Sequence, residues 1–289
     1  MDKKFLVPIL TPFNKDESVN YDALKQLVRK VLDEGADGIY AAGSSAECFL
    51  LSDEERKKTL ETVIKAADGA YVCAHVGDIS NHNTIEFARH AEKVGANSVS
   101  SVPPFYFAYS FQSIKGYYED LASATKLPTL VYNFPGNTGV KFSIENLIDL
   151  LNIKNVESLK FTDTDYFVLE RVKTLTGKFI YSGKDECFLS ALSAGADGAI
   201  GTTFNFMVDK YIRIKKAFDN NDMATARKIQ QSANAITKAV LDTGALFSAS
   251  KYLISLQGIE LGAGRKPFTD ITEEQKSTLK KVYEENINI

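Results

Sequence analysis

The hydrophobic positions of this 289-residue chain are grouped into eight short apolar runs, with longer amphipathic segments between them. The runs are apolar or rich in small residues at both odd and even positions, as expected for parallel strands covered by helices. They begin near Phe5, Gly38, Tyr71, Ser98, Thr129, Glu157, Lys178 and Gly198. The pattern therefore predicts eight strands that alternate with helices.

The first two amphipathic segments carry clear helix boundaries. Tyr21 to Glu34 has apolar positions spaced i, i+3, i+4, i+7 and i+8, which is the spacing of one buried helix face. Gly35 follows, where a left-handed cap is expected to end that helix. The next helix is predicted to begin at Ser52–Glu55, a capping-box sequence with acidic residues in the first turn.

A related tetrapeptide recurs at three predicted junctions between a helix and the following strand. It reads GADG at residues 35–38, GANS at 95–98 and GADG at 195–198. No composition shift and no linker rich in Pro, Gly or Ser separates the strand–helix units. Eight such units predict an α/β fold, a (β/α)8 TIM barrel.

The chain continues well past the eighth predicted strand, which ends near residue 203. Helical segments are expected at 209–220, 222–242, 248–257 and 273–285, more than one closing helix requires. We therefore expect a barrel core at residues 1–205. Residues 206–289 are expected to form the closing helix and a C-terminal helical extension of the same domain.

Composition removes several classes of protein. With 44% hydrophobic and 25% charged residues the chain is typical of globular domains, and disorder is not expected. The 34 basic and 37 acidic residues give a net charge of -3, so no electrostatic footprint for nucleic acid or an anionic membrane is present. No apolar run reaches the roughly 18 residues of a membrane span. The short first run, broken by Pro8 and Pro12, is not expected to be a secretory signal, and a cytoplasmic enzyme is expected.

The cysteines and histidines point in the same direction. The chain has three cysteines with no CxxC pair, and three histidines with no HxH or HExxH pattern. An odd cysteine count suits a reducing compartment and argues against both a disulfide framework and a zinc site. We expect no metal.

Barrel active sites lie at the C-terminal ends of the strands, and Lys160 ends the sixth predicted strand. A lysine there points its amine into the barrel mouth, where loss of hydration favours the neutral form that attacks a carbonyl to form a Schiff base. The alternatives are a lysine that reaches solvent or one paired with a carboxylate such as Asp185. Tyr132, at the end of the neighbouring strand, is either a proton donor and acceptor beside Lys160 or a half-buried packing residue.

Two further strand ends carry polar residues. Ser44 and Ser45 follow the second strand, where two hydroxyls and backbone N–H groups in a tight turn suit a carboxylate. A plain turn or helix cap is the alternative. Asp185 and Glu186 follow the seventh strand and either bind sugar hydroxyls or are simply solvated.

At these residues the chain resembles the Schiff-base aldolase family of N-acetylneuraminate lyase and dihydrodipicolinate synthase. The family's glycine-hydroxyl-hydroxyl-Gly-Glu turn is matched by Gly43–Glu47, and its Tyr-Asn-x-Pro motif by Tyr132–Pro135. Its Schiff-base lysine is matched by Lys160. The resemblance covers essentially the whole chain, from Pro8–Phe13 to Arg265–Phe268.

Within the family, the local sequence is more similar to the lyases. The synthases usually carry an arginine shortly after Tyr-Asn-x-Pro to hold a dicarboxylate, and Gly136–Thr138 contains none. The stretches similar to lyase patterns are residues 74–77, 104–107, 139–141, 183–186 and 201–205.

The resemblance implies reversible cleavage of N-acetylneuraminate to N-acetylmannosamine and pyruvate. Lys160 would form the Schiff base, Tyr132 would move the proton, and Ser44 and Ser45 would hold the carboxylate. No metal and no dissociable cofactor is implied, and the small-molecule partners are pyruvate and a sugar or aldehyde. A homotetramer is implied, with Tyr106 reaching across a subunit interface toward the neighbouring site. Implied contacts to the polyol chain come from Thr162, Gly183, Asp185, Glu186 and Thr202, and Phe247 is expected to border the sugar pocket.

Two residues depart from the family turn. Ser45 stands where threonine is usual, which keeps the hydroxyl and loses a methyl group that restricts rotation. Ala46 replaces a glycine, so a position that needs φ > 0 would be strained. These departures leave open another aldolase of the family, acting on a 2-keto-3-deoxy sugar acid. The synthase reaction and a keto-acid-binding barrel without turnover are less favoured alternatives.

Overall fold

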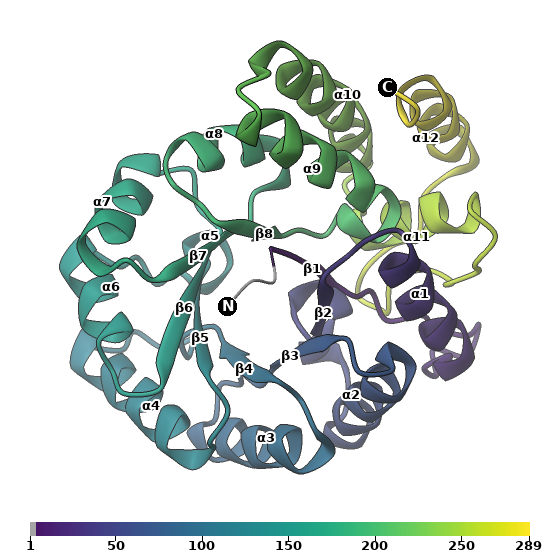
Figure 1. The fold of residues 1–289 in the computed structure, drawn as a ribbon. Helices are drawn as coiled ribbons and strands as arrows, with labels where there is room; N and C mark the ends of the chain where they lie inside the picture. Colours follow the sequence, from purple (N-terminus) through teal and green to yellow (C-terminus); the bar gives the residue numbers. More distant parts are fainter. Residues whose placement is uncertain (1–3) are drawn as a thin grey trace.

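The computed structural model describes residues 4–289, in which eight parallel strands close into a barrel (Figure 1). The order is sequential around the ring, and β1 pairs with β8 through Phe5 opposite Ala199 and Leu6 opposite Ile200. This confirms the predicted TIM barrel and all eight strands. The strands are β1 Phe5–Pro8, β2 Gly38–Ala41, β3 Tyr71–His75, β4 Ser98–Ser101, β5 Thr129–Asn133, β6 Val156–Phe161, β7 Phe179–Ser182 and β8 Gly198–Ile200.

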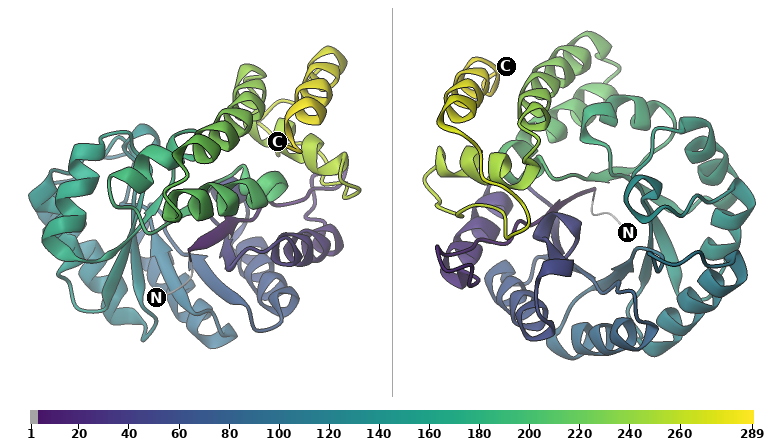
Figure 2. Two further views of the ribbon diagram at one scale, coloured as in Figure 1. Left: turned by 45° about the horizontal axis from the view of Figure 1, so that its top comes forward. Right: turned by 180° about the vertical axis from the view of Figure 1, so that it is seen from behind.

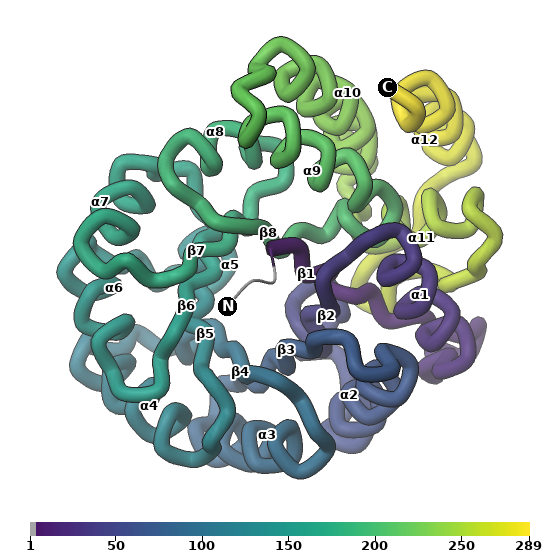
Figure 3. Tube along the Cα trace, in the orientation of Figure 1, coloured from purple at the N-terminus to yellow at the C-terminus, as the bar shows by residue number. Residues whose placement is uncertain are grey.

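Helices surround the barrel, and the trace in Figure 3 follows their alternation with the strands. The two predicted helix boundaries are confirmed: Gly35 has φ 97° after the first helix, and Ser52 and Glu55 form the capping box of the second. The α-helices of the barrel are α1 Tyr21–Asp33, α2 Asp53–Ala67, α3 Asn81–Val94, α4 Phe111–Ala124, α5 Pro135–Thr138, α6 Ile144–Leu151, α7 Tyr166–Thr176, α8 Phe188–Ser193 and α9 Phe204–Asp219. Short 3-10 helices occupy Ser44–Ala46, Cys48–Leu50 and Asp185–Cys187.

The three tetrapeptide junctions share one backbone geometry. Their glycines have φ values of 97°, 94° and 98°, a left-handed conformation that glycine adopts without a Cβ penalty. The third residue of each junction accepts a backbone N–H from the preceding strand with its side chain, and its own N–H donates to the same strand residue. The same junction geometry, used three times, therefore aligns one strand pair at each place. The pairs are Asp37 with Phe5, Asn97 with Val72, and Asp197 with Ile180.

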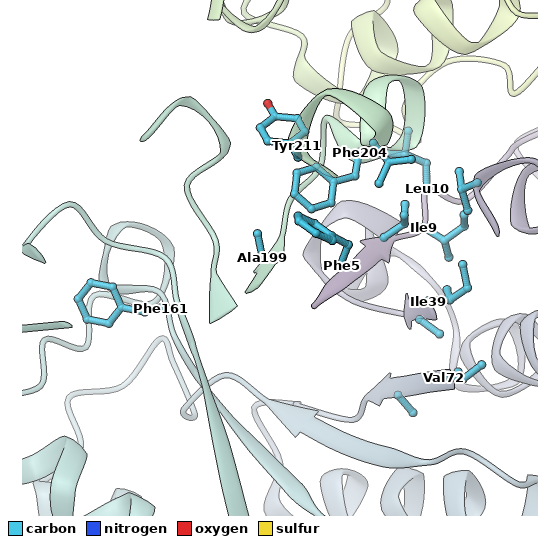
Figure 4. Close-up of a cluster of buried hydrophobic side chains, with 14 of the residues drawn as sticks. Phe5, Ile9, Leu10, Ile39, Val72, Phe161, Ala199, Phe204 and Tyr211 are labelled. Atoms are coloured by element: carbon cyan, nitrogen blue, oxygen red, sulfur yellow. The ribbon is translucent and has the colours of Figure 1, made fainter. Parts of the chain in front are cut away.

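Alternation along the strands divides the buried side chains of the barrel into two clusters, and a third, small cluster of Phe13, Val19 and Leu51 lies outside the strands. One of the two lies between the strands and the surrounding helices, and Figure 4 shows the part in which Phe5 lies beside Phe204, which in turn packs on Tyr211. The other fills the barrel interior and contains Leu6, Tyr40, Cys73, Val102, Leu130, Tyr132, Tyr181 and Ile200. Residues that point inward near the strand ends therefore meet at one place.

The C-terminal helices pack outside the ring beside α9 and α1 (Figure 2). They are α10 Met223–Asp242, α11 Leu246–Ser255 and α12 Glu273–Asn286; α10 packs on α9, and α12 packs on α10 and α11. Helix α9 begins at Phe204, earlier than the predicted residue 209. It is kinked at Met207 (φ -159°, ψ 40°), so the predicted start lies just after the kink. Helix α11 begins two residues before its predicted start. Within residues 4–289, no helix is both long enough and apolar enough to cross a bilayer.

Candidate active site

Lys160 lies inside the barrel, between two tyrosine rings. Its neighbours in the strand register are Tyr132 on β5 and Tyr181 on β7. The Lys160 Nζ lies 4.0 Å from the centre of the Tyr132 ring and 4.6 Å from that of Tyr40, and the residue is only 4% exposed. The sequence analysis placed Tyr132 beside Lys160, and the structure brings the two together. Tyr40 was not predicted.

Neither alternative for the Lys160 amine agrees with the structure. The residue is buried, so it does not extend into solvent. Among residues 4–289, no carboxylate oxygen lies within 4.0 Å of its Nζ, which excludes an ion pair with Asp185. The amine therefore sits against aromatic faces at the barrel mouth without a carboxylate held against it, where it is available to an incoming carbonyl carbon.

The turn after β2 places its two serines beside β8. Gly43 begins the turn, and a Cβ atom there would lie 2.5 Å from the Tyr40 ring, so only glycine fits. The Ser45 Oγ lies 2.7 Å from the Thr202 Oγ1, while the next residue, Ala46, accepts a hydrogen bond from Thr11 Oγ1 through its carbonyl. The structure thus joins Ser45 and Thr202, which sequence reasoning had assigned to different parts of a substrate.

The strain considered for Ala46 is not present. Ala46 belongs to the 3-10 helix Ser44–Ala46, and its φ is not positive. The positive φ angles fall on the flanking residues instead, 55° at both Ala42 and Glu47. Alanine is therefore compatible with this turn as it stands.

Thr162 and Gly183 meet at the ends of β6 and β7. Thr162 is buried, and its Oγ1 has no hydrogen-bond partner among residues 4–289. A Cβ atom on Gly183 would lie 1.8 Å from that Oγ1. The glycine leaves room for a hydroxyl that the protein itself does not satisfy, which is the condition expected for a ligand contact.

Asp185 and Glu186 differ in environment. Asp185 is 7% exposed; its Oδ2 accepts hydrogen bonds from the backbone N and Oγ1 of Thr203, while its Oδ1 is buried and has no partner within residues 4–289. Burial is the largest cause that raises the pKa of Asp185 to about 6. Glu186 is half-buried beside Lys184, with 3.6 Å between the charged atoms. The solvated alternative is therefore wrong for Asp185.

His75 connects two of the strand ends and was not singled out as a site residue. Its Nδ1 lies 3.2 Å from the carbonyl oxygen of Ala42, and its Nε2 accepts the N–H of Val102 at 3.4 Å. Burial, and then the charges of Arg56 and Lys160, hold its pKa well below the usual value, so the ring is neutral. Its position at the end of the third apolar run, within the lyase-like stretch 74–77, could have indicated it.

A cavity of about 450 Å³ adjoins this region at Ser44, Val102 and Phe134, although Lys160 and Tyr132 are not among its lining residues. Ser44 and the predicted Phe247 both line it, together with four phenylalanines that sequence reasoning did not identify: Phe49, Phe105, Phe134 and Phe268. Tyr106 does not line this cavity. It is 83% exposed and, with φ 81°, faces a second cavity of about 790 Å³ beside the first. Within one chain, Tyr106 is therefore not brought to Lys160.

No group of three or more His, Cys, Asp or Glu side chains that could hold a metal ion occurs in residues 4–289. The polar groups around Lys160 are hydroxyls, one buried carboxyl and a neutral imidazole. Such groups suit a small polar organic ligand. The arrangement combines a buried amine, a phenol and several unsatisfied polar atoms, as carbonyl chemistry on a hydroxylated substrate requires.

Comparison with known proteins adds to this geometry. The model of the dihydrodipicolinate synthetase family matches residues 1–286. An N-acetylneuraminate lyase of Rhizobium meliloti is 36% identical over 274 residues, 94% of this chain and 91% of that protein. A solved structure of CdNal from Clostridium difficile, in complex with mannosamine, has a TM-score of 0.96 at 31% identity and covers 99% and 100% of the two chains. A dihydrodipicolinate synthase from Bacillus anthracis reaches 0.94 at 25% identity, with 98% of both chains covered, so the fold alone does not separate the two activities.

Proposed function

The chain belongs to the dihydrodipicolinate synthetase family, and we propose that it is a Schiff-base aldolase that reversibly cleaves N-acetylneuraminate to N-acetylmannosamine and pyruvate. The observation that carries the proposal is the buried Lys160 amine, 4.0 Å from the ring centre of Tyr132, with no carboxylate within ion-pair distance in the described chain. A barrel that only bound a keto acid would need neither an unpaired amine nor a phenol beside it.

In the cleavage direction, the neutral Lys160 amine attacks the C2 ketone of the open-chain sugar acid, and loss of water gives a protonated Schiff base. Tyr132 accepts the proton of the C4 hydroxyl as the C3–C4 bond breaks. The bonding electrons move to the Schiff base and form an enamine, while C4 leaves as the aldehyde of N-acetylmannosamine. Protonation of the enamine at C3 and hydrolysis release pyruvate and restore the amine.

Substrate recognition is divided between two sides of the mouth. Ser44 and Ser45 bind the carboxylate through hydroxyl and N–H groups. The polyol chain binds on the side where two buried oxygens have no hydrogen-bond partner in the described part of the chain, Thr162 Oγ1 and Asp185 Oδ1. Gly183 and Glu186 complete that side, and Thr202, hydrogen-bonded to Ser45, lies where the two sides meet.

The lyase reaction is favoured over the synthase reaction by the cavity lining. Asn137 and Thr138 line the cavity together with Phe134, and this stretch supplies no cation for a second carboxylate. The relatives named as lyases are also more similar in sequence than the synthase.

Borohydride trapping tests the chemistry. Reduction in the presence of pyruvate is expected to add a three-carbon unit to Lys160, identified by the mass of its peptide. The Lys160→Met variant should take up no label. Lys210→Met, which removes another buried lysine, should be labelled as the wild type is. An adduct elsewhere, or none, contradicts the mechanism.

A substrate panel tests the specificity separately. Pyruvate release from N-acetylneuraminate is compared with release from a set of 2-keto-3-deoxy sugar acids. Faster release from N-acetylneuraminate supports the lyase assignment. Negligible release from it, with Lys160 still labelled by pyruvate, would assign the chain to another aldolase of the family.

The proposal extends to a cytoplasmic homotetramer in which Tyr106 reaches a neighbouring site. The exposed aromatic residues Tyr106, Phe107 and Tyr109 support an interface at that loop. Sedimentation should give a tetramer, and Phe107→Ser should weaken it. A monomer with full turnover at micromolar concentration contradicts this assembly.

A further inference from the structure

A fully buried ion pair lies directly behind the Ser44–Ser45 turn. The Lys251 Nζ of α11 is 2.7 Å from the Glu47 Oε1, and both side chains are 0% exposed. The second oxygen of Glu47 accepts the backbone N–H of Arg265 at 2.7 Å, and Lys251 also donates to the carbonyl of Ala263 at 2.9 Å. The pair thus ties the turn to the C-terminal extension, 204 residues further along the chain.

Glu47 occupies an unusual backbone position. It ends the 3-10 helix Ser44–Ala46 and begins the 3-10 helix Cys48–Leu50, with φ 55° and ψ 36°. A non-glycine residue in this left-handed region carries a conformational cost and persists only where its surroundings hold it. Its two oxygens are held by Lys251 and Arg265, so the direction in which the turn presents Ser44 and Ser45 is fixed from behind.

Stability alone is a weak explanation for the pair. Removing two charges from water costs several kcal/mol each, and replacing a buried ion pair by apolar residues is often neutral or stabilising. The Lys251 ammonium is also placed 4.3 Å from the ring centre of Phe13, on the segment that follows β1, so the turn is enclosed on that side as well. The pair therefore fixes the direction in which the turn presents Ser44 and Ser45, and adds little net free energy of folding.

We propose that Glu47 and Lys251 are positioning residues that hold the Ser44–Ser45 turn in the orientation that binds the carboxylate of the keto acid. The inference rests on the proposed function. It assigns to the C-terminal extension a part in binding the carboxylate, in addition to the cavity wall that Phe247 and Phe268 supply.

Reductive trapping with two ketones tests this positioning role. Pyruvate carries the carboxylate, and acetone offers the same ketone without it. In the Lys251→Met variant, the pyruvate concentration that gives half-maximal labelling of Lys160 should rise at least tenfold. The acetone concentration that gives half-maximal labelling of Lys160 should stay within twofold of the wild-type value, because the Lys160 amine itself is undisturbed.

Two further variants make the experiment specific. Glu47→Gln/Lys251→Met removes both charges together and should show the same selective loss, even if the single variant folds poorly. Lys210→Met is the matched control: that lysine is also buried, in α9, where it donates to Ser232 Oγ at 2.9 Å and to the carbonyl of Asn286 at 2.8 Å, both in the C-terminal helices. It should leave both half-maximal concentrations unchanged.

The outcomes separate the two levels of the proposal. Wild-type pyruvate dependence in the double variant, or parallel losses for pyruvate and acetone, overturns the positioning role and leaves the proposed function intact. A wild-type protein that takes up no label at Lys160 overturns the proposed function, and the inference fails with it.

Discussion

Gly183→Ala is expected to disable the site by a displacement that can be worked out from the structure. The added Cβ would lie 1.8 Å from Thr162 Oγ1, 2.8 Å from its Cβ and 3.2 Å from its Cα. Contacts with a real Cβ are essentially never shorter than 3.0 Å, so the hydroxyl must move by about 1.2 Å or more. Rotation about χ1 moves the hydroxyl but leaves the Thr162 Cβ in place, so β6 and β7 must also separate.

The substitution is expected to lower both the stability and the activity of the protein. Overpacking of a tight site costs about 1–3 kcal/mol of unfolding free energy. The Thr162 hydroxyl, a proposed contact to the substrate, is displaced by about 1.2 Å or more, and a misplacement of about 1 Å in a positioning group can lower turnover roughly 100-fold. We expect kcat/KM for N-acetylneuraminate to fall by about that factor, with a modest decrease in Tm.

Pyruvate release measured by a coupled assay, together with thermal unfolding, checks both values. The control is Gly136→Ala, because that glycine also lies near the mouth, in α5, and its added Cβ would approach Phe134 no closer than 3.7 Å. The control should keep wild-type activity. Activity of Gly183→Ala within threefold of the wild type would refute the steric reasoning.

Three further changes test other parts of the structure. Tyr132→Phe should lower kcat by roughly 10²–10⁴ while pyruvate still labels Lys160, as trapping and steady-state kinetics would measure. Because burial raises the pKa of Asp185 from 3.8 to about 6, the native state keeps a proton that the unfolded chain loses first. The unfolding free energy should therefore fall by about 3 kcal/mol as the pH rises from about 4 to above 6. The Asp185→Asn variant should lack this pH-dependent decrease, as urea titrations at about pH 4 and above pH 6 would measure. Gly116→Ala, mid-helix in α4 with no atom within 4 Å of the added Cβ, should stabilise the protein by about 1 kcal/mol in the same titrations.

The parts of the fold that sequence predicts are those set by local pattern. The eight strands follow from apolar runs, and each junction glycine follows from a helix end that needs positive φ. Helix α9 shows the limit of this reasoning. Its first turn, Phe204 to Val208, is buried at every position, including the polar Asn205, so it lacks the periodicity by which a surface helix is recognised.

The site was predictable where one strand end identifies one residue. Lys160 and Tyr132 fall on neighbouring strands at the same register, so the barrel topology places them together. His75 and Tyr40 were missed because each lies within an apolar run, and their contacts, Ala42 for His75 and Lys160 for Tyr40, arise only when the barrel closes. The Glu47–Lys251 contact spans 204 residues and depends on how the extension packs, which no local pattern encodes.

The charges around the mouth clarify how a nearly neutral protein recognises an anion. The two cations behind the serine turn are already neutralised, Lys251 by Glu47 and Arg265 by a bidentate contact with Glu55. Their charges therefore add little field at the turn, and in the proposed mechanism hydroxyl and N–H dipoles bind the substrate carboxylate. This arrangement also favours the chemistry at Lys160. A free cation close to it would raise the cost of every positively charged intermediate on that amine, whereas dipoles aimed at the carboxylate bind the substrate without opposing the charge of the Schiff base.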